Sequence, residues 1–485
     1  MRSLAFFVLL PFFARAQPLA QRMDALTRST PAASQAFWGI RVVDLATGKA
    51  VFEKNADSFF VPASNTKLFT SALALMRLGP SHQFHTRIVA PAPDASGRVH
   101  GDLGMIGGGD PNLSARVLPY RKDEFGPDPL AAVNQLASEI VKHGVREIDG
   151  DIVGDDTAFV WDAYPDGWSI DDAVWEYGAP VSALTLNDNA FTLQIAPGHT
   201  TGAPARLSLS PPLEHLTIQN RVHTIASGDR KLRFQRLPGS RELIVSGTLP
   251  LDDAGTNEVL AVEDPALFAA HALKEALEAR GVIVRGRTAV RHRSPGEPPA
   301  PFAGEMLAEL TSQPLIEILR VLAKESQNLH TELVLREVAR VVSGNGSLSE
   351  GLQQLRQFLT EAGIGEKQYH FDDASGLSRK TLVTPMTVSK LLTYMYGSKL
   401  REEWTGILPV GGVDGTLAKR FRTAHGPEIH AKTGTISHVT ALSGYVLPAA
   451  GRRYAFSILV NNFNAEAPAI RAVTDKIVLT LFDRN

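Results

Sequence analysis

Three short motifs stand in one order along the chain and carry side chains suited to acyl transfer. They are Ser64–Lys67 (SNTK), Ser326–Asn328 (SQN) and Lys432–Thr435 (KTGT). A serine hydroxyl becomes an effective nucleophile only when a neighbouring base removes its proton. On a helix, a lysine three residues after a serine lies on the same face. Ser64 and Lys67 are therefore a candidate nucleophile and base.

The lysine can act as a base only if its amine is neutral at the working pH. Burial and a nearby cation would both lower its pKa, and Lys432 is the candidate cation. If Ser64 begins a helix, the backbone N–H groups there could help to form an oxyanion hole. The structural alternative is that Ser64 only caps the helix.

The second and third motifs supply a proton shuttle and an anion receptor. Ser326 could pass a proton to a leaving amine, and Asn328 could hold a substrate amide. In the third motif, Gly434 allows a substrate backbone to come close to the end of a strand. Its neighbours offer one positive charge and two hydroxyls, which suit a terminal carboxylate: Lys432, Thr433 and Thr435.

Each motif alone is weak evidence. A Ser-x-x-Lys pattern is expected about once by chance in a chain of this length. A second Ser-x-Asn, at Ser343–Asn345, is typical of a turn after a helix. Three matches in the required order, each in fitting local structure, nevertheless favour acyl transfer through a serine ester.

The hydrophobic pattern predicts the elements that must position these motifs. A helix is expected to begin at Ser64 and to end at Gly79-Pro80. The second motif is expected between helices at 314–326 and 331–342, and the third at the end of a strand over 429–433. Further strands are expected at 442–446 and 454–461, before a final helix near 467–482.

About 260 residues (326 minus 64) separate the first motif from the second. The whole chain has 485 residues, which is too many for one hydrophobic core. From about residue 84 to residue 301, short strand-like runs alternate with turns, with helices near 128–143 and 263–280. The sequence therefore predicts a domain of helices and sheet built from both chain ends, with a β-rich insertion long enough for two modules.

The first 16 residues are typical of a secretory signal peptide. Arg2 is the positive end, 4–13 is a short apolar stretch, and Ala14-Arg15-Ala16 suits cleavage. A buried N-terminal strand is the alternative. The chain has no cysteine, which excludes disulfides and thiolate metal sites, and its net charge is −2. We expect a periplasmic protein with no nucleic-acid partner and at most peripheral membrane association, and a homodimer stays open.

The ordered motif set resembles that of the penicillin-binding proteins and serine β-lactamases. Five further stretches resemble one branch more closely, the D-alanyl-D-alanine carboxypeptidase/endopeptidases of the class C low-molecular-mass type. These stretches are 107–111 (GGGDP), 155–159 (DDTAF), 325–332 (ESQNLHTE), 373–379 (DASGLSR) and 408–417 (LPVGGVDGTL). The chain departs from the family pattern at Gln327, where Asp is usual, and at Thr435, where many relatives have Ser.

The resemblance implies an α/β (α+β) fold, in which a β-lactamase/transpeptidase-like domain carries two nested β-rich inserted domains. It places the catalytic domain at 17–82 plus 303–485, inserted domain II at 83–178 plus 262–302, and inserted domain III at 179–261.

The resemblance also implies roles for single residues. Ser64 would form the acyl-enzyme with Lys67 as general base, and Ser326 would protonate the leaving D-alanine. Lys432 would bind the terminal carboxylate, and the N–H groups of Ser64 and Thr435 would form the oxyanion hole.

Two further residues would bind the diaminopimelate side chain of the substrate. Asp155 would meet its amine, with Asp156 as a close rival, and Arg379 would bind its carboxylate. The structural alternatives are that Asp155 caps a turn and that Arg379 forms a structural ion pair.

The resulting interpretation is a periplasmic serine DD-peptidase that acts on the stem peptides of peptidoglycan. It would remove terminal D-alanine from pentapeptides and cut D-alanyl–diaminopimelate cross-links, without a metal or cofactor. β-Lactam antibiotics would inhibit it by acylating Ser64. One alternative is a serine β-lactamase, and the long insertion argues against it. The other is a non-catalytic wall-binding or β-lactam-sensing protein, and the intact motifs argue against that.

Overall fold

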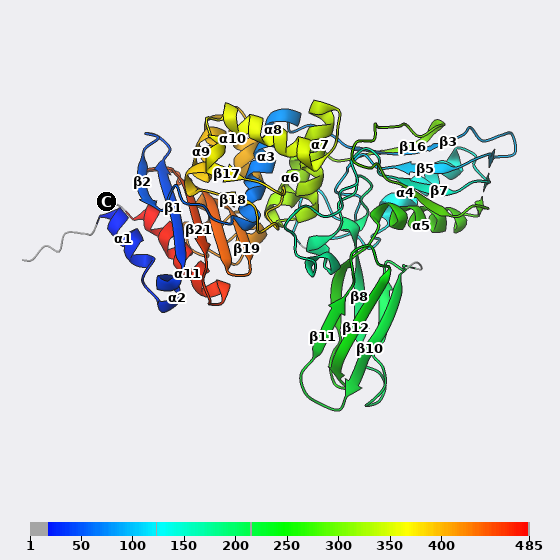
Figure 1. Ribbon diagram of the computed structural model, residues 1–485, viewed down its shortest axis with the longest axis horizontal. Coiled ribbons are helices and arrows are strands. Elements are labelled where there is room, and N and C mark those ends of the chain that lie inside the picture. Colours follow the sequence, from blue (N-terminus) through cyan, green and yellow to red (C-terminus); the bar gives the residue numbers. More distant parts are fainter. Residues whose placement is uncertain (1–17, 123, 214–215, 484–485) are drawn as a thin grey trace, which may run out of the picture.

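The two ends of the chain meet in one antiparallel sheet. The computed structural model describes residues 18–122, 124–213 and 216–483, so the predicted signal peptide lies outside the described residues. The sheet has the order β19-β20-β21-β1-β2. Figure 1 shows that β1 and β2, from the N-terminal end of the chain, lie beside β21, from its C-terminal end. Its strands are β1 (Phe37–Asp44), β2 (Ala50–Lys54), β19 (Ile429–Ile436), β20 (Val439–Val446) and β21 (Tyr454–Asn461).

Helices cover both faces of this sheet, so its central strands are apolar throughout. β21 sends Phe456, Ile458 and Val460 to one face, where α1 (Leu19–Leu26), α2 (Pro31–Gln35) and α11 (Ala467–Leu479) pack. The alternate side chains Ala455 and Leu459 face a larger group of helices. That group comprises α3 (Lys67–Leu78), α6 (Leu315–Lys324), α7 (Asn328–Ser343), α8 (Leu348–Glu361), α9 (Pro385–Gly397) and α10 (Arg401–Ile407).

Local signals explain where these helices begin and end. The Thr384 side chain accepts the N–H of Thr387 at the start of α9, and proline follows it at the first helical position. The Ser347 side chain accepts the N–H of Glu350 at the start of α8. α7 ends at Ser343 and is capped by Gly344, whose φ of 75° lies in the left-handed region that glycine adopts without strain.

A second sheet lies in the long insertion and has the order β15-β7-β5-β3-β16. Its strands are β3 (His85–Ala90), β5 (Leu103–Ile106), β7 (Ile152–Asp155), β15 (Thr288–Arg291) and β16 (Glu305–Thr311), and α4 (Ala131–Lys142) and α5 (Pro265–Glu278) pack beside it. Just before β7 the chain forms a separate short strand, β6 (Glu147–Ile148), and turns between the two. β6 joins β4 (Arg98–Val99) and β14 (Ile283–Val284) in a small separate sheet.

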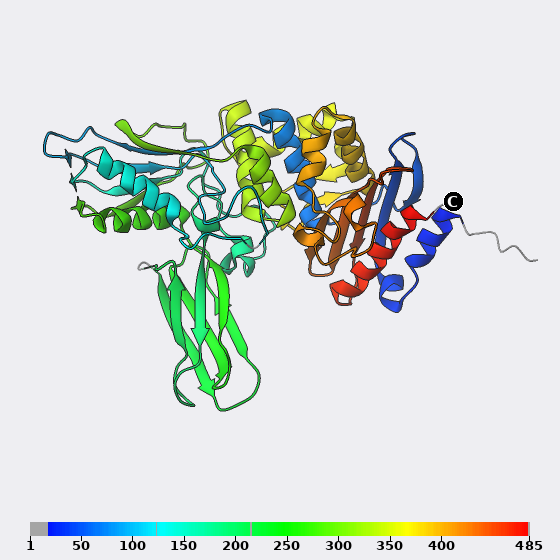
Figure 2. The same ribbon diagram turned by 180° about the vertical axis from the view of Figure 1, so that it is seen from behind.

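The middle of the insertion forms a stalk that projects from the rest of the molecule, as Figures 1 and 2 show. One of its sheets pairs β13 (Thr256–Ala261), β8 (Ala190–Ala196) and β9 (Arg206–Ser210). The other pairs β10 (Thr217–Ile225), β12 (Glu242–Pro250) and β11 (Lys231–Gln235), in that order.

The predicted fold class is confirmed: an α/β catalytic domain carries β-rich inserted domains. The exact domain boundaries stay a prediction, and β16 lies just beyond the expected end of the insertion at 302 while pairing with β3 inside it. Within the described ranges, no helix combines the length and apolarity needed to cross a bilayer.

Candidate active site

Ser64 lies in a tight turn against the edge strand of the catalytic sheet. The sequence predicted an α-helix from this residue, whereas a single 3₁₀ turn, Ala63–Thr66, precedes α3. Ala63 has a φ of 48°, a backbone strain of the kind found at functional sites. The Asn65 side chain donates to the Lys432 backbone oxygen at 2.9 Å and so joins this turn to β19.

Lys67, at the start of α3, is almost completely buried behind Ser64, with 1% of its surface exposed. Its Nζ lies 2.9 Å from Ser64 Oγ, and it donates to Asn328 Oδ1 at 2.6 Å and to the Ser375 carbonyl at 2.7 Å. Burial lowers the pKa of Lys67 from 10.5 to about 7, although the carboxylates of Asp373 and Glu332 oppose the shift. A substantial fraction of this amine is therefore neutral near pH 7.

Two buried carboxylates fix the position of the Ser375 carbonyl, which contacts Lys67. Glu332, on α7, accepts the backbone N–H groups of Ala374 and Ser375, each at 3.0 Å. Asp373 accepts the Ser375 hydroxyl at 3.0 Å and the Ser378 N–H at 2.9 Å. The loop that follows residue 372 is thus fixed beside Lys67.

Ser326 lies between α6 and α7, as the sequence predicted, and has a φ of 65°. The Lys432 Nζ donates to its Oγ at 2.8 Å. Burial, and then the positive charge of Lys67, hold the pKa of Lys432 well below its ordinary value. Asn328 bridges the motifs, since its Oδ1 accepts from Lys67 and its Nδ2 donates to the Tyr177 carbonyl at 2.8 Å.

The third motif runs along β19, at the open edge of the sheet. A Cβ added to Gly434 would lie 2.8 Å from the Pro62 carbonyl and 3.0 Å from the Ser64 nitrogen, so this close approach requires glycine. Thr433 Oγ1 hydrogen-bonds to Thr416 at 2.8 Å. The next residue, Thr435, lines the cleft beside Ser64.

Four motif residues line one cleft of about 440 Å³, namely Ser64, Ser326, Asn328 and Thr435, whereas the buried Lys67 and Lys432 do not line it. One end is lined by Ser64, Ser326 and Asn328. The other end carries charged groups from distant segments: Asp171, Asp172 and Arg379. Arg379 also donates to the Ser437 carbonyl at 3.2 Å. The structure thus brings Arg379 to the cleft together with the motif residues.

The structure does not bring Asp155 or Asp156 to this cleft. Asp155 ends β7 with 1% of its surface exposed, and its carboxylate pairs with Arg291 of β15 at 2.9 Å. Asp156 is buried against His292 at 3.0 Å. Both carboxylates already have partners inside the inserted domain, so their position does not support contact with a substrate.

Sequence reasoning missed Asp171 and Asp172. They follow Ser169 and Ile170 in a loop rich in tryptophan and proline, where an acidic pair reads as an ordinary surface turn. One signal in the sequence could have indicated their position: among the described residues, no strand lies near residues 171 and 172 in sequence, so the loop that carries them is free to reach the catalytic domain.

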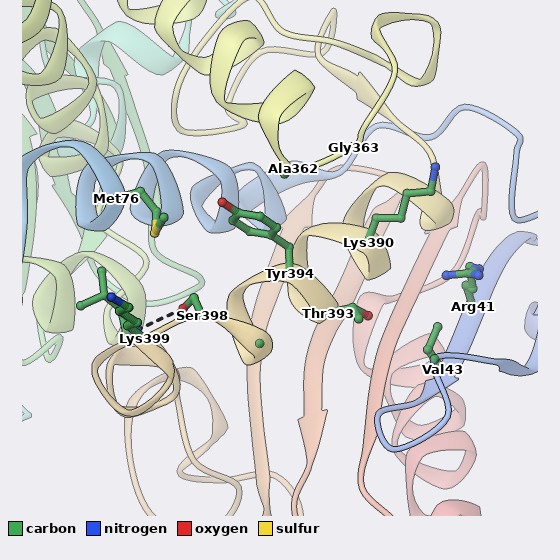
Figure 3. A pocket seen from close by; sticks show the side chains of 13 residues that line it. Arg41, Val43, Met76, Ala362, Gly363, Lys390, Thr393, Tyr394, Ser398 and Lys399 are labelled. Carbon is green, nitrogen blue, oxygen red and sulfur yellow. Dashed lines mark hydrogen bonds between the residues drawn. The ribbon is translucent and has the colours of Figure 1, made fainter.

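A larger cavity of about 1040 Å³ lies elsewhere, between the catalytic sheet and α9. Figure 3 shows Lys390 and Tyr394 of α9 along it, with Arg41 and Val43 of β1 at one end and Met76 at the other. None of the three motifs lines this cavity, so the chemistry belongs to the smaller cleft.

The described chain matches known proteins over nearly its full length. The model of the D-Ala-D-Ala carboxypeptidase 3 (S13) family matches residues 19–482. A D-alanyl-D-alanine carboxypeptidase from an Actinomadura species is 36% identical over 96% of this chain and 85% of its own length. The D-alanyl-D-alanine carboxypeptidase DacB of Haemophilus influenzae is 24% identical over 95% of this chain and 92% of its own length.

The fold agrees with a solved structure. The crystal structure of penicillin binding protein 4 (dacB) from Haemophilus influenzae superposes with a TM-score of 0.83 and 23% identity, over 95% of this chain and 99% of that one. The resemblance inferred from the motifs is therefore confirmed, and the enzyme is a serine-type, penicillin-binding DD-peptidase. By the extent of these matches, the chain belongs to the D-Ala-D-Ala carboxypeptidase 3 (S13) family.

Proposed function

We propose that Ser64 is the nucleophile that attacks the carbonyl carbon of a D-alanyl bond in a peptidoglycan stem peptide, with Lys67 as its base. The observation that carries this proposal is a pair of lysine–serine contacts in one cleft: Lys67 to Ser64 at 2.9 Å and Lys432 to Ser326 at 2.8 Å. A neutral Lys67 has two N–H groups, which Asn328 and the Ser375 carbonyl accept, so its lone pair is left for the Ser64 proton.

The remaining steps follow from the same geometry. The N–H groups of Ser64 and Thr435 stabilise the oxyanion, because β19 and the 3₁₀ turn approach closely at Gly434. Ser326 hands a proton to the leaving amine, and Lys432, with the hydroxyls of Thr433 and Thr435, binds the terminal carboxylate. An arriving carboxylate favours the protonated form of Lys432. Water then hydrolyses the Ser64 ester of the substrate, whereas the Ser64 ester formed by a β-lactam is hydrolysed slowly.

The charged end of the cleft selects the diaminopimelate side chain, which ends in an amine and a carboxylate. Asp171 and Asp172 receive the amine, in place of the Asp155 expected from the sequence, and Arg379 receives the carboxylate. Terminal D-alanine and a cross-linked diaminopimelate leave from the same kind of bond. The enzyme therefore acts as a carboxypeptidase and as an endopeptidase, and the predicted signal peptide places it in the periplasm.

Purified muropeptides read by mass spectrometry test these assignments. We expect the mature protein to release D-alanine from pentapeptide stems and to split D-alanyl–diaminopimelate dimers, and Ser64→Ala to do neither. Arg379→Ala should lower kcat/KM for diaminopimelate stems roughly ten-fold and leave lysine-containing stems, which lack the second carboxylate, unchanged.

The neighbouring Lys380 is the matched control, because it is exposed and does not line the cleft. Lys380→Ala should change neither rate. Equal losses on both stems in Arg379→Ala would refute the proposed role of Arg379. Full activity on both substrates in Ser64→Ala would refute the whole mechanism.

A further inference from the structure

A second groove, of about 490 Å³, meets the catalytic cleft at Asp171, which lines both. It runs between the loop that carries the acidic pair and β11 of the stalk. The loop contributes Ile170, Val174 and Trp175, and the strand and its end contribute Phe234 and Leu237. Asp171 thus connects the charged residues of the cleft with the lining of this groove.

The groove presents exposed apolar surface next to aromatic rings. Ile170 is 68% exposed and Leu237 is 72% exposed, which is unusual for large aliphatic side chains. The rings of Trp175 and Phe234 pack edge to face at 5.3 Å and leave part of each ring accessible. Such walls suit the C–H faces of a pyranose ring.

Two arginines supply positive charge at the groove. Arg233 is exposed and makes no ion pair with any residue that the structure describes. Arg236 is buried and donates to the backbone oxygens of Ala261 and Ala173, the latter at 3.0 Å. Arg236 thus locks the loop to the stalk, so the groove is preformed, while Arg233 is left to meet a ligand.

We propose that this groove binds the sugar-bearing end of the acyl-donor stem. The proposal rests on the function proposed above, in which the diaminopimelate side chain lies at Asp171. From diaminopimelate, a stem continues through a γ-linked glutamate with a free carboxylate, then alanine, to the lactyl sugar. Arg233 binds the glutamyl carboxylate, and the sugar ring packs on Trp175, Phe234 and Leu237.

The test compares two substrates on the intact mature enzyme. One is a disaccharide-linked pentapeptide, and the other is the tripeptide diaminopimelyl-D-Ala-D-Ala, which lacks the glutamate and the sugar. We expect Arg233→Ala and Leu237→Ser each to lower kcat/KM for the disaccharide substrate about ten-fold. Activity on the short peptide and the rate of penicillin acylation should not change. Both side chains are exposed, so the fold should survive, and thermal unfolding checks this.

Lys231→Ala is the matched control, since Lys231 is an exposed cation on the same strand that does not line the groove. It should behave as wild type with both substrates. Equal wild-type kcat/KM values for the two substrates, or equal losses on both in Arg233→Ala, would overturn the groove proposal. A wild-type enzyme that neither forms a penicillin adduct nor cleaves the short peptide would instead overturn the proposed function itself.

Discussion

The pH dependence of acylation provides a sharp test of Lys67 as the base. Its pKa of about 7 means that about 90% of the amine is neutral at pH 8 and about 1% at pH 5. The acylation rate should therefore fall roughly 90-fold between these two values, because only the neutral amine accepts the Ser64 proton. A lysine with its ordinary pKa of 10.5 would be neutral in only about 0.03% of molecules at pH 7.

Stopped-flow acylation by a fluorescent penicillin between pH 5 and pH 9 measures this profile, with circular dichroism at each pH to confirm that the protein stays folded. The second-order rate constant should follow one ionisation near pH 7. Lys67→Arg should lose the profile and nearly all acylation, since a guanidinium stays protonated. A wild-type acylation rate that does not change from pH 5 to pH 8, or one that follows an ionisation near pH 10, would refute Lys67 as a base whose pKa is lowered by burial.

Three further predictions follow from buried contacts in the catalytic and inserted domains. Arg116→Ala should lower the free energy of unfolding in urea by about 3 kcal/mol and slow penicillin acylation. The reason is that the substitution removes the ion-pair partner, at 3.1 Å, of Glu325, which directly precedes the second motif. An unchanged acylation rate would contradict this prediction. Burial opposes protonation of His292, but the carboxylates of Asp156 and Asp264 outweigh burial and raise the pKa of His292 to about 10. The stabilisation that the protonated His292 gives to the folded protein should be complete below about pH 6.5 and lost as the pH rises through 10. The wild-type advantage over His292→Gln in urea melts should therefore shrink across that range, and a constant difference would argue against the ion pair. Gly434→Ala should slow penicillin acylation roughly ten-fold or more without unfolding the protein, because the added methyl displaces the nucleophile's turn; a wild-type rate would show that the close approach is not needed.

The candidate catalytic residues could be predicted because local rules position them. Ser64 and Lys67 meet within one helical turn, and the second motif stands where one helix ends and the next begins. The third motif lies within β19, which begins at Ile429, the residue where the sequence predicted a strand to begin. The 3₁₀ geometry at Ser64 was not predictable, because it depends on the strained Ala63 and on contact with β19.

The candidate specificity residues were harder to predict, because their surroundings come from distant parts of the chain. Asp155 looked available for a ligand, but β7 pairs with β15 and places Arg291, 136 residues later (291 minus 155), beside it. Helix α1 and strands β8, β10 and β13 were also missed. The strand preference of β8, β10 and β13 depends on the strands that they pair with in the folded protein.

Mass spectrometry of the intact protein after brief exposure to penicillin tests the acyl-serine mechanism most directly. One adduct per chain should form, it should map to the peptide that contains Ser64, and Ser64→Ala should form none while releasing no D-alanine from a pentapeptide stem. A folded wild-type protein without an adduct, or an adduct on another residue, would contradict the mechanism.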